Sequence, residues 1–105
     1  MNKFIGAFAF QNMGNGCLAG KYFNNGIPRA YSECCVNTQQ NITEPTDPFI
    51  GRFFSTWIEE SESPESGFLT ISARGEQGLY TLEWEGSFTG EGMLMNGILV
   101  GWYRN

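Results

Sequence analysis

The sequence predicts one all-β domain covering residues 1–105: an antiparallel up-and-down meander of about eight short strands that forms a small barrel. Three observations support this fold class. Aromatic residues make up 15% of the chain and glycine contributes 14 residues, a composition suited to strands and turns. Several short segments alternate between apolar and polar residues. Turn-forming residues separate these segments, and a two-sheet β-sandwich is the alternative arrangement of the same strands.

The clearest alternation lies in the last third of the chain. Tyr80, Leu82 and Trp84 fall on one face of an extended segment, whereas Thr81 and Glu83 fall on the other. A period of two residues is typical of a strand with one buried face and one wet face, as in antiparallel sheets. We therefore expect the aromatic face of this segment to point into the core.

Eight segments have the length of strands, and the connections between most of them are short. Such connections join antiparallel neighbours and leave no room for crossover helices. The predicted strands cover approximately residues 3–10, 17–23, 29–36, 49–58, 67–73, 79–85, 87–94 and 98–103.

The connections carry recognisable turn and loop signals. Asn96-Gly97 stands between two apolar runs and predicts a tight hairpin. Residues 37–48 are polar and contain two prolines, so they are predicted to form a long loop. Residues 59–66 are rich in Glu and Ser and are predicted to form an acidic, solvated loop.

Closure of the sheet is the point that separates the barrel from the sandwich. A meander leaves unpaired edges unless its first strand pairs with its last, and only a barrel removes both edges. Gly90 and Gly92 lie two residues apart in one predicted strand. Such a pair predicts a bend or a bulge where a barrel strand curves, and this favours the barrel.

Charge and composition exclude several classes of partner. The net charge is −5, and the six Lys and Arg residues are scattered along the chain. Nucleic acids and anionic membrane surfaces both require clustered cations, so neither is an expected partner. The apolar run within residues 1–10 is too short for a membrane span and precedes no convincing cleavage site, so we expect a cytoplasmic location.

The sequence contains no convincing catalytic, metal or cofactor site. Histidine is absent, which removes the commonest general base and metal ligand. Glu83 and Glu85 form the one conceivable carboxylate pair, but the wet face of a strand explains them better. Cys17, Cys34 and Cys35 show no metal-binding spacing; we expect free thiols or small buried hydrophobes, with one bridge from Cys17 left open. We therefore expect a protein that is not an enzyme.

One segment resembles the small barrels of the avidin and lipocalin type. Residues 20–25, with the sequence Gly-Lys-Tyr-Phe-Asn-Asn, are similar to the early strand of avidins, in which Gly, an aromatic pair and Asn follow in that order. The resemblance implies a barrel, and it implies that Asn24 contacts a ligand. The pocket tryptophans of avidins have no counterpart here, so the resemblance does not imply biotin.

Two functions fit this architecture. The first is binding of a small, partly apolar molecule in an aromatic-lined pocket at a barrel mouth. The second is self-association, as in a homodimer, through an exposed strand or aromatic face, because Phe53-Phe54 and residues 98–103 are apolar on both faces. The aromatic residues can also be explained as packed core. The candidate ligand-binding residues are Tyr22, Asn24, Trp57, Tyr80, Trp84 and Trp102.

Overall fold

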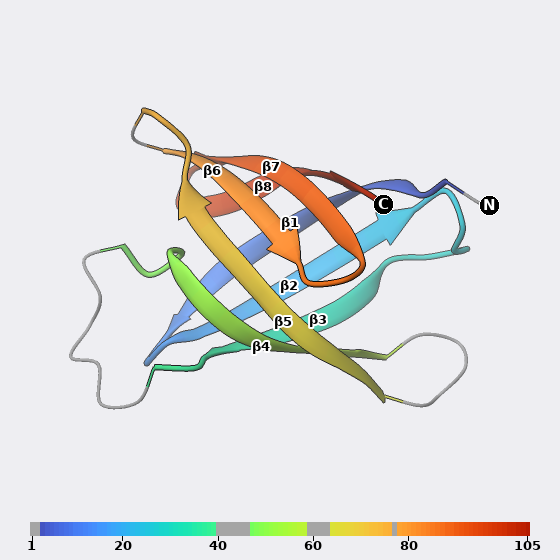
Figure 1. Ribbon diagram of the computed structural model, residues 1–105, viewed down its shortest axis with the longest axis horizontal. Helices are drawn as coiled ribbons and strands as arrows, with labels where there is room; N and C mark the ends of the chain where they lie inside the picture. Colours follow the sequence, from blue (N-terminus) through green and yellow to red (C-terminus); the bar gives the residue numbers. More distant parts are fainter. Residues whose placement is uncertain (1–2, 40–46, 59–63, 77) are drawn as a thin grey trace.

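The computed structural model describes residues 3–39, 47–58, 64–76 and 78–105. The described residues form eight strands and no helix. Each strand pairs antiparallel with the next, and β8 pairs with β1, so the sheet closes into a barrel (Figure 1). The strands are β1 (Ile5–Gly14), β2 (Cys17–Asn24), β3 (Tyr31–Asn37), β4 (Gly51–Ile58), β5 (Pro64–Ala73), β6 (Leu79–Trp84), β7 (Phe88–Met95) and β8 (Ile98–Arg104).

The structure confirms the predicted closed meander and excludes the alternative two-sheet β-sandwich. Several strand boundaries were wrong: β1 continues to Gly14, four residues beyond its predicted end, and β4 begins at Gly51 and not at residue 49. Pro64, Glu65 and Ser66 were predicted to lie in the acidic loop, but they extend β5 by pairing with the end of β4. Most of the two predicted loops, at residues 40–46 and 59–63, lies outside the described residues. The structure contains no described helix long and apolar enough to cross a membrane.

Two hairpins are closed by Asn-Gly pairs. Asn96 and Gly97 have φ angles of 53° and 79°, and Asn15 and Gly16 have φ angles of 54° and 78°. A two-residue type I′ turn needs positive φ at both central positions, which asparagine tolerates and glycine adopts freely. The hairpin predicted at Asn96-Gly97 is thus confirmed.

Of the bend or bulge predicted at Gly90 and Gly92, the bulge is absent. Both residues pair in continuous register with β6 and with β8, and the sheet's register shift lies in β1 instead, between Asn12 and Gly14. Close approach explains the two glycines better. A Cβ at Gly90 would lie 2.3 Å from the carbonyl oxygen of Trp102, and Gly92 stands directly opposite Gly101.

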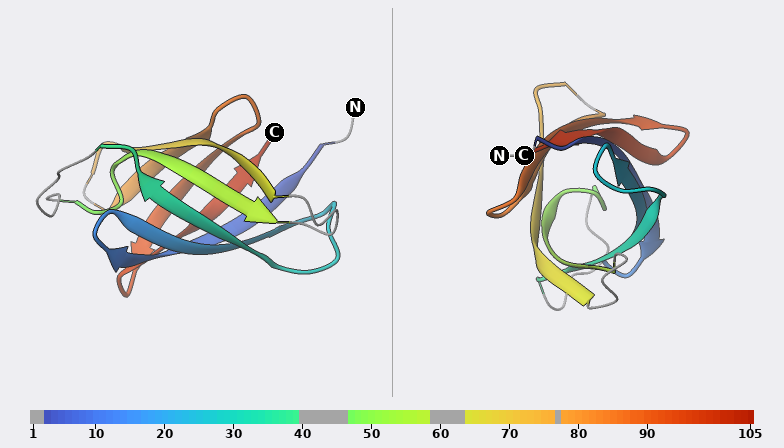
Figure 2. Two further views of the ribbon diagram at one scale, coloured as in Figure 1. Left: turned by 90° about the horizontal axis from the view of Figure 1, so that it is seen from below. Right: turned by 90° about the vertical axis from the view of Figure 1, so that its right-hand side faces the viewer.

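The middle of the barrel is filled with side chains. Alternate residues of each strand point inward, and Phe10, Phe53, Leu69, Leu82 and Leu99 are almost fully buried there. An eight-stranded barrel has an interior just wide enough for such packing. A ligand site inside the barrel must therefore lie at one of its ends, and Figure 2 (right) shows the barrel close to end-on.

The end at which β1 finishes and β4 begins is closed by the segment that leads into β4. Phe49 is buried and packs edge-on against Tyr80, with 6.2 Å between ring centroids. Asp47 accepts hydrogen bonds from the Tyr80 hydroxyl at 2.7 Å and from the Phe49 amide at 2.9 Å. We call this the closed end.

Candidate functional site

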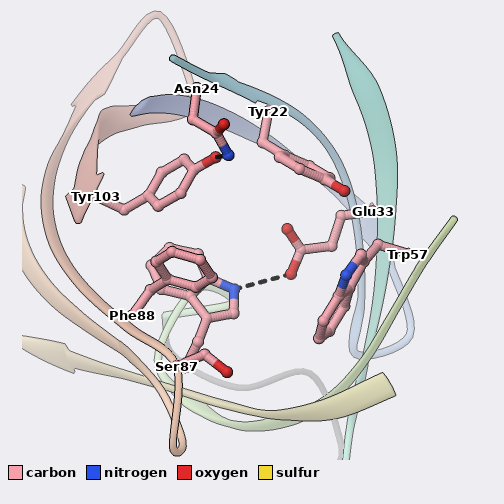
Figure 3. A pocket seen from close by; sticks show the side chains of 8 residues that line it. Tyr22, Asn24, Glu33, Trp57, Ser87, Phe88 and Tyr103 are labelled. Atoms are coloured by element: carbon pink, nitrogen blue, oxygen red, sulfur yellow. Dashed lines mark hydrogen bonds between the residues drawn. The ribbon is translucent and has the colours of Figure 1, made fainter. Parts of the chain in front are cut away.

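The opposite end of the barrel holds a pocket, and we call it the open end. It lies where β2, β4, β6 and β8 finish, at the right-hand side of Figure 1. The space open to the centre of a water molecule measures about 50 Å³, enough for roughly three to five waters. Its lining residues are Tyr22, Asn24, Glu33, Trp57, Trp84, Ser87, Phe88 and Tyr103 (Figure 3).

Glu33 supplies the only acidic group among these lining residues. Alternation along β3 turns Glu33 and Cys35 inward and leaves Cys34 exposed. Glu33 is only 6% exposed. Its Oε2 atom accepts hydrogen bonds from the Ser55 hydroxyl, from the Trp84 indole nitrogen at 2.9 Å and from the Cys35 thiol at 3.9 Å. Glu33 therefore ties β3 to β4 and, across the barrel, to β6.

The second carboxyl oxygen of Glu33 has a different environment. In Figure 3 it points into the space bounded by Tyr22, Tyr103 and Phe88. All three hydrogen bonds that the described residues make to this carboxyl reach Oε2, and none reaches Oε1. The pocket thus presents one hydrogen-bond acceptor that a bound molecule could use.

The surroundings of Glu33 favour its neutral form. Burial raises the pKa of this carboxyl above its ordinary value, and the hydrogen bonds from Ser55, Trp84 and Cys35 oppose that shift only in part. Within the described part of the chain, no Lys or Arg forms an ion pair with it. The pKa of the neighbouring Cys35 thiol is also raised, by burial first and by Glu33 second, so this thiol is not an activated nucleophile.

The aromatic walls of the pocket are held in place by contacts with one another. The Phe88 and Tyr103 rings meet edge to face at 5.2 Å, and the Trp84 and Tyr103 rings lie 5.6 Å apart. The Tyr103 hydroxyl accepts a hydrogen bond from the Asn24 side chain at 2.9 Å and donates one to the Phe23 carbonyl at 3.2 Å. The pocket is therefore formed before any ligand arrives.

Four of the six predicted ligand-binding residues meet at this pocket: Tyr22, Asn24, Trp57 and Trp84. The other two lie elsewhere. Tyr80 belongs to the closed end, where its hydroxyl bonds Asp47. Trp102 lies on the outer face of β8 and is 41% exposed, so it does not line the pocket.

Sequence reasoning missed Glu33 and Ser55, which are the buried polar residues among those that the structure describes. Ser55 could have been placed, because it stands midway between Phe53 and Trp57 in a strand of period two. The burial of Glu33 carried no such signal. Its neighbours Cys34 and Cys35 are the same residue type, so the sequence does not show which face of β3 points inward.

The remaining residues considered for catalysis or metal binding do not form a reactive site. Glu83 and Glu85 are both exposed, and Glu85 forms an ion pair with Arg52 at 3.0 Å, which lowers the pKa of that carboxyl. All three cysteines are free. The Ser55 hydroxyl touches a carboxyl, but it is fully buried and does not line the pocket, so it cannot attack a substrate there.

Nor do the described residues bring together three or more Cys, Asp or Glu side chains in a group that could hold a metal ion. The arrangement can do one thing well: enclose a small group between aromatic faces and accept a hydrogen bond from it. Comparison of the chain with protein-family models, with curated protein sequences and with solved structures finds no match.

Proposed function

We propose that this barrel is a binding protein that holds a small molecule in the open-end pocket. The observation that carries the proposal is the buried Glu33 carboxyl, whose Oε1 faces an aromatic-walled cavity without a hydrogen-bond donor from the described residues. This oxygen borders the cavity, and a bound ligand can supply it with a hydrogen-bond donor.

A purely structural role explains Glu33 less well. A buried ionisable group contributes little net stability, and an apolar residue of similar volume usually serves a core as well or better. Strongly perturbed carboxyls that line a cavity are more typical of functional sites. The wholly filled middle of the barrel shows that this fold can pack its interior when no cavity is needed.

The size of the pocket limits what enters it. A cavity with room for roughly three to five waters accepts a head group of about that many heavy atoms and leaves the rest of a larger ligand at the barrel mouth. Most of the walls are aromatic, so the part that enters is expected to be partly apolar.

Native mass spectrometry of the freshly purified protein tests the proposal, with its denatured mass as the reference. We expect a bound molecule that leaves on denaturation, or binding of members of a small-molecule library to the emptied protein. The three tryptophans supply matched variants. Trp57→Ala should weaken binding, whereas Trp102→Ala, on the outer face, should not. A protein that binds nothing in either format contradicts the proposal.

A second candidate function is self-association of two copies of this chain. Its support is an outer apolar face on β2, β1, β8 and β7, where Phe23 and Trp102 flank Ala7 and Met93 stands beside Val100. Phe23, Met93 and Trp102 are all exposed. A second copy could cover this face and remove its apolar area from water.

Light scattering coupled to gel filtration tests the second candidate. The wild-type protein should elute as a dimer, and Trp102→Lys should convert it into a monomer because a charge would be buried in the contact. Phe54→Lys is the matched control, since Phe54 is equally exposed but lies on β4. A monomeric wild-type protein would exclude this function.

A further inference from the structure

We infer that the group bound at the open end is an alkylammonium that carries at least one N–H, held by Glu33 Oε1 and enclosed by the aromatic walls. The inference rests on the proposed function and narrows it to one class of ligand. It follows from three properties of the pocket: an acceptor to which no described residue donates, a ring of aromatic faces and the absence of cationic side chains among the described lining residues.

The carboxyl supplies the first argument. An ionised carboxylate in a buried site needs both hydrogen bonds and a countercharge. The described donors all reach Oε2, which leaves Oε1 to the cavity. The cations of the chain are engaged elsewhere or lie outside the pocket; Arg52 pairs with Glu85, and Arg74 pairs with Glu91 at 2.8 Å. An N–H-bearing cation would supply Oε1 with a donor that the described residues do not provide, together with the countercharge that allows Glu33 to ionise.

The walls supply the second argument. Five of the eight lining residues are aromatic, contributed by β2, β4, β6, β7 and β8: Tyr22, Trp57, Trp84, Phe88 and Tyr103. Aromatic faces attract a cation within about 6 Å of the ring centroid, and tryptophan does so most strongly. Glu33 comes from β3, so six of the eight strands contribute to one enclosure for a positive charge.

The field of the protein supplies the third argument. With a net charge of −5, the chain attracts cations from solution and repels anions. An anionic ligand would also meet the Glu33 carboxyl with no Lys or Arg in the pocket to offset the repulsion. A neutral ligand could donate a hydrogen bond to Oε1, but it would supply no countercharge, so the buried carboxyl would keep its proton.

Calorimetric titration at pH 8 with three probes tests the inference: n-butylammonium, the uncharged n-butanol and tetramethylammonium, which lacks an N–H. We expect n-butylammonium to bind at least tenfold more tightly than n-butanol, and tetramethylammonium to lie between them. Glu33→Gln keeps the shape of the side chain and removes its charge. This variant should weaken n-butylammonium by about tenfold to a hundredfold and leave n-butanol unchanged.

As the pH falls through the raised pKa of Glu33, the same titration should show weaker binding of n-butylammonium, because Glu33 must give up a proton. Among the described residues, the other titratable groups at this carboxyl are the Cys35 thiol, whose pKa is raised, and the phenols of Tyr22 and Tyr103. The pH dependence should therefore disappear in Glu33→Gln.

Each outcome decides a different statement. If n-butanol binds as tightly as n-butylammonium, the pocket is a ligand site but not a cation site, and this inference alone fails. If no probe binds and native mass spectrometry finds no ligand, the proposed function itself fails. If Glu33→Gln does not fold, Phe88→Leu takes its place: it should weaken n-butylammonium severalfold and n-butanol little, and equal weakening of both would overturn the inference.

Discussion

The two ends of the barrel differ in how they satisfy the hydrogen-bonding needs of a carboxyl. Each end places a described carboxyl beside aromatic rings. At the closed end, Asp47 is half-buried and accepts from Tyr80 and from a backbone amide, so each of its oxygens has a partner. At the open end, Glu33 is buried more deeply, and its three partners share one oxygen.

This difference separates a carboxyl that completes the fold from one that is left available. The Phe49 ring fills the closed end, whereas the corresponding space at the open end stays as a cavity. Both ends are made by the same strands, so the topology does not dictate the difference. It arises from a few side chains, and each can be changed separately.

The largest expected effect on stability comes from removing the Phe49 ring at the closed end. Phe49→Ala should lower the free energy of unfolding by about 3–5 kcal/mol, because Phe49 is buried and the truncation leaves a cavity. Phe88→Ala, at the open end, should cost clearly less, since Phe88 is only partly buried and already borders a cavity. Urea unfolding of both variants measures the two losses of unfolding free energy. Equal losses would show that the two ends are packed alike.

A smaller effect is expected from the hydroxyl that supports Glu33. Ser55→Ala should lower the free energy of unfolding by about 1–3 kcal/mol, because it removes a donor from a buried carboxyl. Ser32→Ala is the matched control, since Ser32 is exposed on β3 and should change stability by less than about 0.5 kcal/mol. The same unfolding experiment serves both, and a silent Ser55→Ala would show that this hydrogen bond does not stabilise the folded state.

At the closed end, the hydrogen bond between Tyr80 and Asp47 should contribute less to the free energy of unfolding than the Ser55–Glu33 bond does. Tyr80→Phe should cost about 0.5–1.5 kcal/mol at neutral pH. Burial and the Asp47 carboxylate raise the pKa of Tyr80 to about 12 from an ordinary value of 10. The folded protein therefore holds this proton longer than the unfolded chain does, and stability should fall as the pH rises from 10 through 12. Tyr80→Phe should reduce that fall, and ultraviolet titration should lose one tyrosine that ionises near pH 12.

The smallest expected effect concerns the pH dependence of the ligand-free protein. The pKa of Glu33 is raised by burial, so the folded state binds its proton more tightly than the unfolded chain does. The contribution of Glu33 to stability is therefore fully present below its ordinary pKa of 4.5 and is lost as the pH rises through the folded value. The difference in unfolding free energy between wild type and Glu33→Gln, followed upward from pH 4, should show this decline. A flat difference would mean that Glu33 ionises as easily in the fold as outside it.

The alternating segments made most of the barrel predictable. Tyr80, Leu82 and Trp84 all point inward as expected, because their strand has a single apolar face. The same pattern could not show that Tyr80 and Trp84 serve opposite ends. Four residues of extended chain span roughly 13 Å, so two aromatics on one face of a strand can belong to different sites.

Where both faces of a strand are apolar, the sequence could not assign an inside. Trp102 and Tyr103 are neighbours in β8, and packing turned Tyr103 into the pocket and Trp102 outward. The inward orientation of Glu33 could not be predicted for a related reason, because a polar residue normally marks the solvent-facing side of a strand. The prediction therefore found three of the five described aromatic residues of the pocket, and it missed Phe88, Tyr103 and the Glu33 carboxyl.

The seam between β1 and β8 makes the order of the strands circular. The Phe4 amide donates to the Asn105 side chain at 2.9 Å, and the Asn105 amide donates to the Phe4 carbonyl at 3.3 Å. A short peptide could therefore join these two points, and a cut between Asn96 and Gly97 would leave every strand beside its present neighbours. Such a circular permutant would carry Glu33 in the middle of a rearranged chain and still place it at the same mouth of the same barrel.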